Sequence, residues 1–500
     1  MKSFIFLAHF KKNAYLCGGF DKTSFIMLIG REKQQQELLN LLERDESQFC
    51  AIYGRRRVGK TYLVKQTFQN QFAFVHSGLN DATKDEQLWE FRESLRSAGV
   101  KKCKLPKTWF EAFHLLEDYL VTLPQTKKIV FIDELPWLDT PKSRFLPAFE
   151  HFWNGWANMR DDIVLIVCGS ATSWILENIV NNHGGLHNRL TRQIHLQPFS
   201  LHECEQYMQS NNILLSRKDM AEAYMIMGGV PYYWSYLRRG ESLSQNIDRM
   251  FFAQDAPLKN EFKVLYKSLF KRSDVYLQIV ESLTKRRAGL LREEILRETG
   301  LDDSESFQRA MRELEECGFI RKYNMYEYKA KNALYQLIDN FTLFHFQHIA
   351  SNVPQDEHYW SGRRLSGDLN AWAGLAFERL CLLHAPQIKH ALGISGVVST
   401  FYSWTYKPGN DDPTEGFQID MLIDRDDRII NLCEMKFTED EYVVTAEDDR
   451  LLRRRISRFL TKTETKKIIH PVLITTYGLS HKGYASVYQR TITLDDLFHE

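Results

Sequence analysis

The stretch GRRRVGKT, Gly54 to Thr61, decides how the first part of the chain is expected to fold. It matches the pattern GxxxxGK[ST], in which two glycines, a lysine and a hydroxyl-bearing residue stand at fixed positions. An apolar run, Gln48 to Tyr53, precedes this stretch, and a helical pattern that continues to Phe68 follows it. We therefore predict a buried strand, a phosphate-binding loop and a helix, in that order.

The residue types in this stretch suit a nucleoside triphosphate bound with Mg²⁺. Gly54 and Gly59 let the backbone bend closely around an anion, so that successive N–H groups and the helix N-terminus point at the phosphates. Lys60 is expected to reach the terminal phosphates, and the Thr61 hydroxyl is expected to reach the metal. The predicted nucleotide-binding residues of the loop are Gly54, Arg55, Arg56, Arg57, Val58, Gly59, Lys60, Thr61 and Tyr62.

A second apolar run, Lys128 to Glu134, ends in two carboxylates. Such a run is typical of a buried parallel strand whose C-terminal end faces the ligand. Asp133 is predicted to hold the metal through water, and Glu134 to orient or deprotonate the attacking water. Paired acids after a strand are usually a helix cap or a turn. Together with Lys60 and Thr61, however, they indicate a site for nucleotide hydrolysis.

Two further places are candidates for contact with the nucleotide. A third apolar run, Ile163 to Gly169, delivers Ser170 to the edge of the sheet. There Ser170 either reads the terminal phosphate or caps the helix that follows. Arg189 and Arg192 precede another strand-like run. An arginine at this place either neutralises charge in the transition state, in cis or on a neighbouring subunit, or lies solvated at the surface.

Length and composition exclude some classes of protein. A chain of 500 residues is too long for one core and indicates about three domains. Lys and Arg number 65 against 64 Asp and Glu, so any contact with nucleic acid depends on local patches. The eight cysteines form no CxxC pair, which is typical of reduced thiols in the cytoplasm. The apolar stretches are strand-sized, which predicts no membrane span.

Strand and helix patterns alternate up to about Phe199, which predicts an α/β fold with a parallel sheet covered by helices on both faces. Three helical patterns and a β-rich ribbon, Phe319 to Leu337, then give the outline of a winged helix between residues 263 and 345. Its third helix, Ser304 to Cys317, is the candidate recognition helix, but the four glutamates on it favour a protein or interdomain contact equally. The candidate DNA contacts are Gln308, Arg309, Arg312, Arg321, Lys322, Lys329 and Lys331.

The C-terminal part contains a predicted hairpin, Phe417 to Phe437. A symmetric turn opposes Met421 with Cys433 on one face and Asp420 with Glu434 on the other. Directly opposed carboxylates repel each other unless a cation lies between them. Mg²⁺ and Mn²⁺ prefer oxygen ligands of this kind. The pattern therefore predicts a divalent metal site on the hairpin.

Other residues extend this predicted site. Lys436 lies on the same side of its strand as Glu434 and is expected to position or activate a hydrolytic water. Glu378, on a preceding helical pattern, is a candidate third metal ligand. The alternative is a solvent-facing ladder in which Lys436 simply neutralises the two acids. The basic run Arg450 to Arg458 either guides a nucleic-acid backbone or forms an ordinary amphipathic helix.

The chain resembles prokaryotic, archaeal-type P-loop ATPases related to the AAA+ and STAND ATPases. The resemblance rests on IGREKQ (29–34), YGRRRVGKT (53–61), FIDELPWL (131–138), CGSATSW (168–174), LQPFS (196–200) and GGVPYY (228–233). It implies binding of ATP and Mg²⁺, with slow hydrolysis. The C-terminal part resembles the PD-(D/E)xK nuclease superfamily, with Asp420 and the run Glu434-Met435-Lys436 at the motif positions. Ile419 stands where a proline is frequent, and many domains of this fold bind without cutting.

These observations predict five segments. They are an N-terminal extension (1–27, with translation starting at Met1 or Met27), a P-loop ATPase core (28–199), a helical lid (200–262), a winged helix (263–345) and a C-terminal α/β restriction-endonuclease-like domain (346–500).

We expect a cytoplasmic ATPase without a membrane partner, whose nucleotide state controls a nuclease-like domain acting on DNA or other nucleic acid through a second Mg²⁺ or Mn²⁺. The alternative is a nucleotide-switched regulator in which the winged helix binds DNA or protein and the C-terminal domain is a scaffold. A homo-oligomer is compatible with both.

Overall fold

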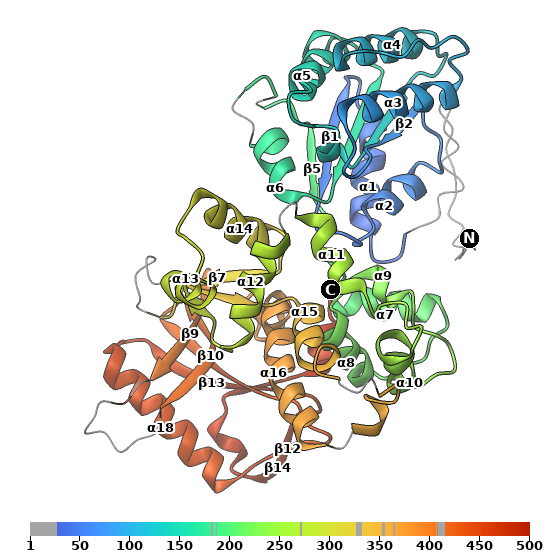
Figure 1. Ribbon diagram of the computed structural model, residues 1–500. Helices are drawn as coiled ribbons and strands as arrows, with labels where there is room; N and C mark the ends of the chain where they lie inside the picture. The colour runs from blue at the N-terminus through green and yellow to red at the C-terminus, as the bar shows by residue number, and fades with distance from the viewer. Residues whose placement is uncertain are drawn as a thin grey trace. The chain divides into compact units, whose positions relative to one another are not determined.

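The computed structural model describes residues 28–500 except 182–183, 187, 271–272, 327–332, 353–355, 364–365, 407 and 409–415. The predicted extension 1–27 and the candidate DNA contacts Lys329 and Lys331 lie outside the described residues. The chain forms two compact units, drawn in Figure 1 with the labels used below. The described part of the first unit is residues 28–198 and 264–273, and the second unit comprises 199–263 and 274–500.

The first unit contains a five-stranded parallel sheet with the order β2-β3-β4-β1-β5. Its strands are β1 (Gln48–Tyr53), β2 (Phe74–Ser77), β3 (Lys128–Asp133), β4 (Ile163–Gly169) and β5 (Arg192–His195). Every residue of β1, β3 and β4 is buried, as continuous apolar runs predict for parallel strands covered on both faces. Because β4 lies between β1 and β3, the carboxyl ends of these three strands meet at one edge.

Helices cover both faces of this sheet, which confirms the predicted α/β arrangement (Figure 1). Alternate residues of β1 point to opposite layers: Phe49 packs in one core and Cys50 in the other. The first core is completed by α3, α4 and α5, and the second by α1 and α2. The helices are α1 (Glu32–Leu39), α2 (Lys60–Thr67), α3 (Lys84–Ala98), α4 (Trp109–Val121), α5 (Phe145–Gly155) and α6 (Thr172–Ile175).

The segment predicted as a lid is helical and belongs to the second unit. Its helices are α7 (Leu201–Ser210), α8 (Arg217–Met227), α9 (Pro231–Trp234) and α10 (Leu243–Ile247), and α11 (Glu261–Leu269) follows. The Leu201 N–H donates to Nε2 of His384 at 3.1 Å, and the Asn340 side chain donates to the Tyr224 carbonyl at 3.0 Å. These bonds tie α7 and α8 to elements near the C-terminal domain.

Three helices and a small sheet follow at the positions of the winged-helix patterns. The helices are α12 (Ser273–Thr284), α13 (Arg292–Thr299) and α14 (Glu305–Glu316). The strands β6 (Leu290–Leu291), β7 (Ile320–Tyr323) and β8 (Leu334–Leu337) form an antiparallel sheet with the order β6-β8-β7. The short helix α15 (Asn340–Phe344) leads into the C-terminal domain.

The C-terminal domain is built on a mixed five-stranded sheet with the order β15-β13-β11-β10-β9. Its strands are β9 (Ser399–Tyr406), β10 (Phe417–Arg425), β11 (Ile429–Lys436), β13 (Ile468–Thr475) and β15 (Arg490–Thr493), and a separate pair joins β12 (Tyr442–Val444) to β14 (Leu479–Gly483). Met421 lies opposite Cys433, which confirms the predicted register of the hairpin. The helices are α16 (Gly367–Leu383), α17 (Ala385–Ala391) and α18 (Ala446–Thr463), and Leu452 and Phe459 of α18 pack in the core of this sheet.

Candidate functional sites

The loop between β1 and α2 has a backbone that bends tightly. Gly54 and Gly59 have φ angles of 143° and 94°, and Arg57 has a φ of 72°. A Cβ at Gly54 would lie 2.3 Å from the carbonyl oxygen of Leu196, so this position excludes any side chain. A Cβ at Gly59 would meet nothing within 4 Å. The loop is thus closed against the sheet at its start and open where α2 begins, as a phosphate cradle requires.

Three side chains predicted to act together meet at this loop. The buried Lys60 ammonium donates to the carbonyl oxygens of Gly54 at 2.7 Å and Arg55 at 3.1 Å. The Thr61 hydroxyl donates to Oδ2 of Asp133, at the end of β3, at 2.6 Å. Burial raises the pKa of the Asp133 carboxyl, and the hydrogen bond from Thr61 opposes that rise. An ammonium, a hydroxyl and a carboxylate in this arrangement suit the terminal phosphates and Mg²⁺ of a nucleotide.

Glu134 is held in place by Ser170. Oε2 of Glu134 accepts hydrogen bonds from the Ser170 N–H at 3.0 Å and from the Ser170 hydroxyl at 2.8 Å. Glu134 has a left-handed backbone, with a φ of 46°, which turns the chain out of β3. The N-cap residue of α6 is Ala171, without a side-chain capping bond. The Ser170 hydroxyl therefore binds the predicted catalytic carboxylate instead of capping the helix.

Two glycines allow these loops to approach one another. A Cβ at Gly169 would lie 2.9 Å from the ring of Pro136 and from the side chain of Ile175. A Cβ at Gly78, after β2, would lie 2.7 Å from the carbonyl oxygen of Glu134. Both positions therefore require glycine, because the turn that carries Glu134 fills the space.

The structure shows different surroundings for the two predicted arginines. Arg192 pairs with Cys50 along β1, and its guanidinium forms an ion pair with Glu37 of α1 at 2.6 Å. Arg189 is exposed. The strand residue that does reach the loop edge is His195, which pairs with Tyr53. Arg192 is engaged by Glu37, and a role of either arginine in the transition state, in cis or on a neighbouring subunit, stays a prediction.

The sequence reasoning did not single out His195. Its ring stacks on Tyr53 with centroids 4.8 Å apart and planes inclined by 14°. Burial lowers its pKa, and the nearby Lys60 ammonium lowers the pKa further. The signal that could have identified this position is the alternation of residues in the strand-like run after Arg192.

The predicted C-terminal site contains arginines between its carboxylates. Arg287, from the turn between α12 and β6, donates to Oδ2 of Asp420 at 2.9 Å and also bonds to Glu378 of α16. Arg455 of α18 donates to Oε1 of Glu434 at 2.5 Å. Burial raises the pKa of Asp420, the charge of Arg287 lowers it, and the charge of Glu434 raises it. The repulsion from which the sequence predicted a metal is therefore relieved by guanidinium groups.

Lys436 is half-buried on β11 and lies within electrostatic reach of Asp448 in the first turn of α18. Among the residues that the structure describes, no group of three or more His, Cys, Asp or Glu side chains is arranged to hold a metal ion. A divalent ion at Asp420 and Glu378 would need Arg287 to move aside. The metal site on the hairpin therefore stays a prediction.

The candidate DNA contacts and the basic run of α18 differ in their exposure and in their partners. Arg321 donates to Oε1 of Gln336 at 2.7 Å, and burial lowers its pKa, so it does not present a free cation to a nucleic acid. Gln308, Arg309, Arg312 and Lys322 are exposed. In α18, Arg453 forms an ion pair with Asp449 at 2.9 Å, and the helix buries Leu452, so the amphipathic alternative describes much of this run.

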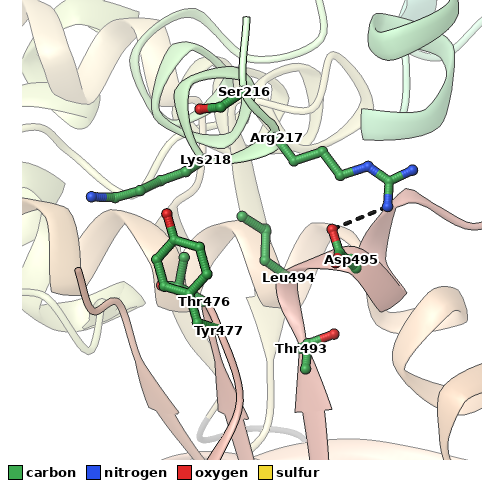
Figure 2. Close-up of a pocket in the computed structure, with 8 residues that line it drawn as sticks. All are labelled: Ser216, Arg217, Lys218, Thr476, Tyr477, Thr493, Leu494 and Asp495. Atoms are coloured by element: carbon green, nitrogen blue, oxygen red, sulfur yellow. Dashed lines mark hydrogen bonds and ion pairs between the residues drawn. The ribbon is translucent and has the colours of Figure 1, made fainter. Parts of the chain in front are cut away.

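The second unit also has a pocket of about 170 Å³, shown in Figure 2. It lies between the N-terminus of α8 and the ends of β13 and β15. The pocket is lined by Ser216, Arg217, Lys218, Thr476, Tyr477, Thr493, Leu494 and Asp495. The Arg217 guanidinium reaches Asp495 at 3.0 Å and Glu205 at 2.8 Å (Figure 2 for the first pair). Lys218 is paired with Glu439. Because its cations already have carboxylate partners, this pocket does not call for an anionic ligand.

Comparison with known proteins agrees with the loop geometry. Residues 28–237 match the model of a family described as an ATPase domain predominantly from Archaea. The match supports a P-loop ATPase domain in this segment. An uncharacterized protein of Methanocaldococcus jannaschii is 24% identical over 366 residues, which cover 71% of this chain and 76% of that protein.

Two solved structures are similar to the chain at low identity. A Walker-type ATPase of Pyrococcus abyssi is 18% identical with a TM-score of 0.46, covering 63% of this chain and 95% of that one. The ORC2 protein of Aeropyrum pernix, solved as ADPNP–ADP complexes, is 15% identical with a TM-score of 0.42, covering 66% and 94%. None of the described helices is both long and apolar enough to cross a membrane.

We predict that Lys60→Ala abolishes ATP binding. The variant loses a charged donor to the phosphates, and hydrogen bonds to charged groups are worth about 1.5–3 kcal/mol each. Isothermal titration calorimetry with Mg²⁺-ATP should show heat for the parent and none for the variant. Lys65→Ala, an exposed lysine on the same helix, is the matched control and should bind like the parent. Unchanged affinity in Lys60→Ala would show that the loop is not the phosphate site.

Proposed function

We propose that this chain is an ATP-hydrolysing switch of the AAA+/STAND-like kind, whose nucleotide state controls a C-terminal nuclease-like domain. The observation that carries the first half is the meeting of Lys60, Thr61, Asp133 and Glu134 at one edge of the sheet. Bound Mg²⁺ would supply charge stabilisation to the phosphates, with Thr61 and Asp133 as its holders. These residues fit because their oxygens are already 2.6 Å apart at the mouth of the loop.

Glu134 has the position and chemistry of the base in this proposal. It follows Asp133 directly, and Ser170 binds only one of its carboxylate oxygens, Oε2, at 2.8 and 3.0 Å. The two bonds from Ser170 fix the carboxylate, so that it presents a defined face to an attacking water. Ser170 is thus a positioning residue, and its contact with Glu134 offers a route by which the terminal phosphate influences the base.

We predict that Glu134→Gln binds ATP but hydrolyses it roughly 10²–10⁴-fold more slowly, the usual contribution of a general base. Glutamine keeps the acceptor oxygen for Ser170 and lacks only the basic carboxylate, so the fold of the turn is retained. Phosphate release under single-turnover conditions measures the rate, and calorimetry with Mg²⁺-ATP checks the affinity. A variant that hydrolyses ATP at the parental rate would remove Glu134 from the mechanism.

The second half of the proposal rests on the hairpin. Asp420 and Glu434 lie on adjacent strands, and Lys436 lies two residues beyond Glu434 on β11. The sheet that carries them is covered by α18 on the face where Leu432 is buried. In the proposed resting state Arg287 and Arg455 neutralise the carboxylates, and a divalent ion together with nucleic acid replaces Arg287 when the domain acts.

A regulator with an inactive scaffold is the second candidate function, and the arginines favour it. Carboxylates that already have guanidinium partners have less need of a metal, because each ion pair satisfies lone pairs that the metal would use. In this alternative the three helices and small sheet of residues 273–337 bind DNA or protein through the exposed Arg309 and Lys322. Metal-dependent activity separates the two candidates.

We predict Mg²⁺- or Mn²⁺-dependent cleavage of a nucleic acid that is lost in Lys436→Ala. The panel contains single-stranded DNA, duplex DNA and RNA, each with and without ATP, and cleavage is read on denaturing gels. Lys466→Ala, an exposed lysine in the same domain, serves as the control for the loss of one positive charge. Purified parent protein that cuts no substrate under any of these conditions would favour the regulator.

We also predict that Arg287→Gln binds Mn²⁺ at least about tenfold more tightly than the parent, a difference of about 1.4 kcal/mol. The reason is that the guanidinium competes with the ion for Glu378 and Asp420. Calorimetry with MnCl₂ in the Lys60→Ala background, without nucleotide, isolates this site from the ATP site. Arg286→Gln is the matched control, because the neighbouring Arg286 pairs with Glu294 instead. Equal Mn²⁺ affinities in the two variants would argue against a metal at these carboxylates.

A further inference from the structure

Arg379 of α16 is a buried cation without a counterion in the described part of the chain. Its side chain belongs to a residue only 8% exposed, and its Nε and Nη2 atoms are buried without a hydrogen-bond partner. Burial and, to a smaller extent, the charge of Arg287 lower the pKa of Arg379 to about 10. An arginine guanidinium nevertheless keeps its proton in proteins. The second unit therefore keeps a full positive charge inside it.

Such a charge is unfavourable in a folded chain. A buried ion that lacks a partner loses its hydration without a compensating attraction. Arg249, in the same unit, shows the usual solution: its guanidinium bonds to Glu241 at 2.9 Å, to Asn246 at 2.6 Å and to the Tyr236 carbonyl at 2.9 Å. The isolation of Arg379 therefore points to a partner that is not part of the protein.

The charged group that acts on Arg379 is Arg287, and Arg287 reaches solvent. Its side chain is 44% exposed. The turn that carries it is anchored, since Gln336 donates to the Arg287 carbonyl at 2.7 Å and Tyr323 donates to the Ala288 carbonyl at 2.5 Å. A fixed main chain holds the base of Arg287, while the side chain extends over the carboxylates. An anion that reaches Arg287 from solvent would also come under the influence of Arg379.

We propose that Arg379 and Arg287 together form a binding site for a phosphate group. A guanidinium offers its N–H donors as a planar fork, and tetrahedral phosphate has enough oxygens to accept from two forks at once. A carboxylate has oxygens enough for the donors of only one guanidinium. The nearby carboxylates of Glu378 and Asp420 already bond to Arg287. The phosphate belongs either to a nucleic-acid backbone or to a free phosphate compound. The site goes beyond the proposed function, because it requires neither a metal nor cleavage.

Thermal unfolding with added ligand tests this site. All chains carry Lys60→Ala, so that phosphate at the ATP loop does not contribute. The ligands are inorganic phosphate, a short single-stranded oligodeoxynucleotide, and the same oligonucleotide with uncharged methylphosphonate linkages, each against chloride at equal ionic strength. We expect at least one of the first two to raise the unfolding temperature and the uncharged oligonucleotide to have no effect. A shift with inorganic phosphate alone identifies a free phosphate, and a shift with the charged oligonucleotide identifies a backbone.

The variant Arg379→Met separates a ligand site from a structural role. Because the lone charge destabilises the fold, the variant without ligand should unfold at a temperature higher than its parent by roughly 2–4 °C or more, and it should lose the ligand-induced shift. Arg249→Met, which removes a fully partnered guanidinium, should instead unfold at a lower temperature. Arg287→Gln, at a half-exposed position, should fold and show a reduced shift, whereas Arg239→Gln, an exposed arginine, should keep the full shift.

Three results would overturn the proposal. The first is an Arg379→Met chain that unfolds at a lower temperature or does not fold, since this would mean that the guanidinium has a stabilising partner within the protein. The second is a ligand-induced shift that is the same with and without Arg379. The third is an unfolding temperature that changes neither with inorganic phosphate nor with the charged oligonucleotide. Arg379 would then be a buried charge whose hydrogen bonds go only to water.

Discussion

The ATPase domain depends on the hydrogen bond from Thr61 to Asp133, which is 2.6 Å long and joins the start of α2 to the end of β3. Thr61 follows β1 across the phosphate loop, Asp133 ends β3, and β4 separates these two strands in the sheet. The two residues meet because three fully buried strands run parallel and end at one edge, where Gly54 and Gly169 let the backbones approach. The same packing brings Ser170 to Glu134, so the geometry of the whole site follows from the burial of these strands.

Local pattern was sufficient to predict the parts of the molecule that are periodic. The phosphate loop, Asp133 and the pairing of Met421 with Cys433 follow from residue type, spacing and the period of two along a strand. The bond between Ser170 and Glu134 and the two arginines on the C-terminal carboxylates were not predicted. They depend on side-chain conformations and on contacts such as that of Arg287 with Asp420, which are 133 positions apart. No sequence window contains that information.

The repulsion between the C-terminal carboxylates can be relieved by more than one kind of cation. Opposed carboxylates require positive charge nearby, and either a metal ion or a guanidinium group can supply it. Arg287 and Arg455 meet it within the protein, and Arg379 adds a cation that meets no acid. Positive charge beyond what the carboxylates need is costly for stability and favourable for an anionic ligand. The proposed phosphate site rests on this additional cation, which an ion-pair network that served only the fold would not need.

The boundary of the ATPase family match and the boundary of the compact unit do not coincide. The family match runs to residue 237, whereas the first unit ends at Pro198 before it resumes at Val264. The helices α7 and α8 are thus ATPase sequence that packs with the second unit, through bonds such as that from Leu201 to the buried His384. Within this unit α8 packs against α16, which carries both Glu378 and Arg379. Part of the sequence that matches the ATPase family therefore belongs to the same compact unit as the C-terminal carboxylates.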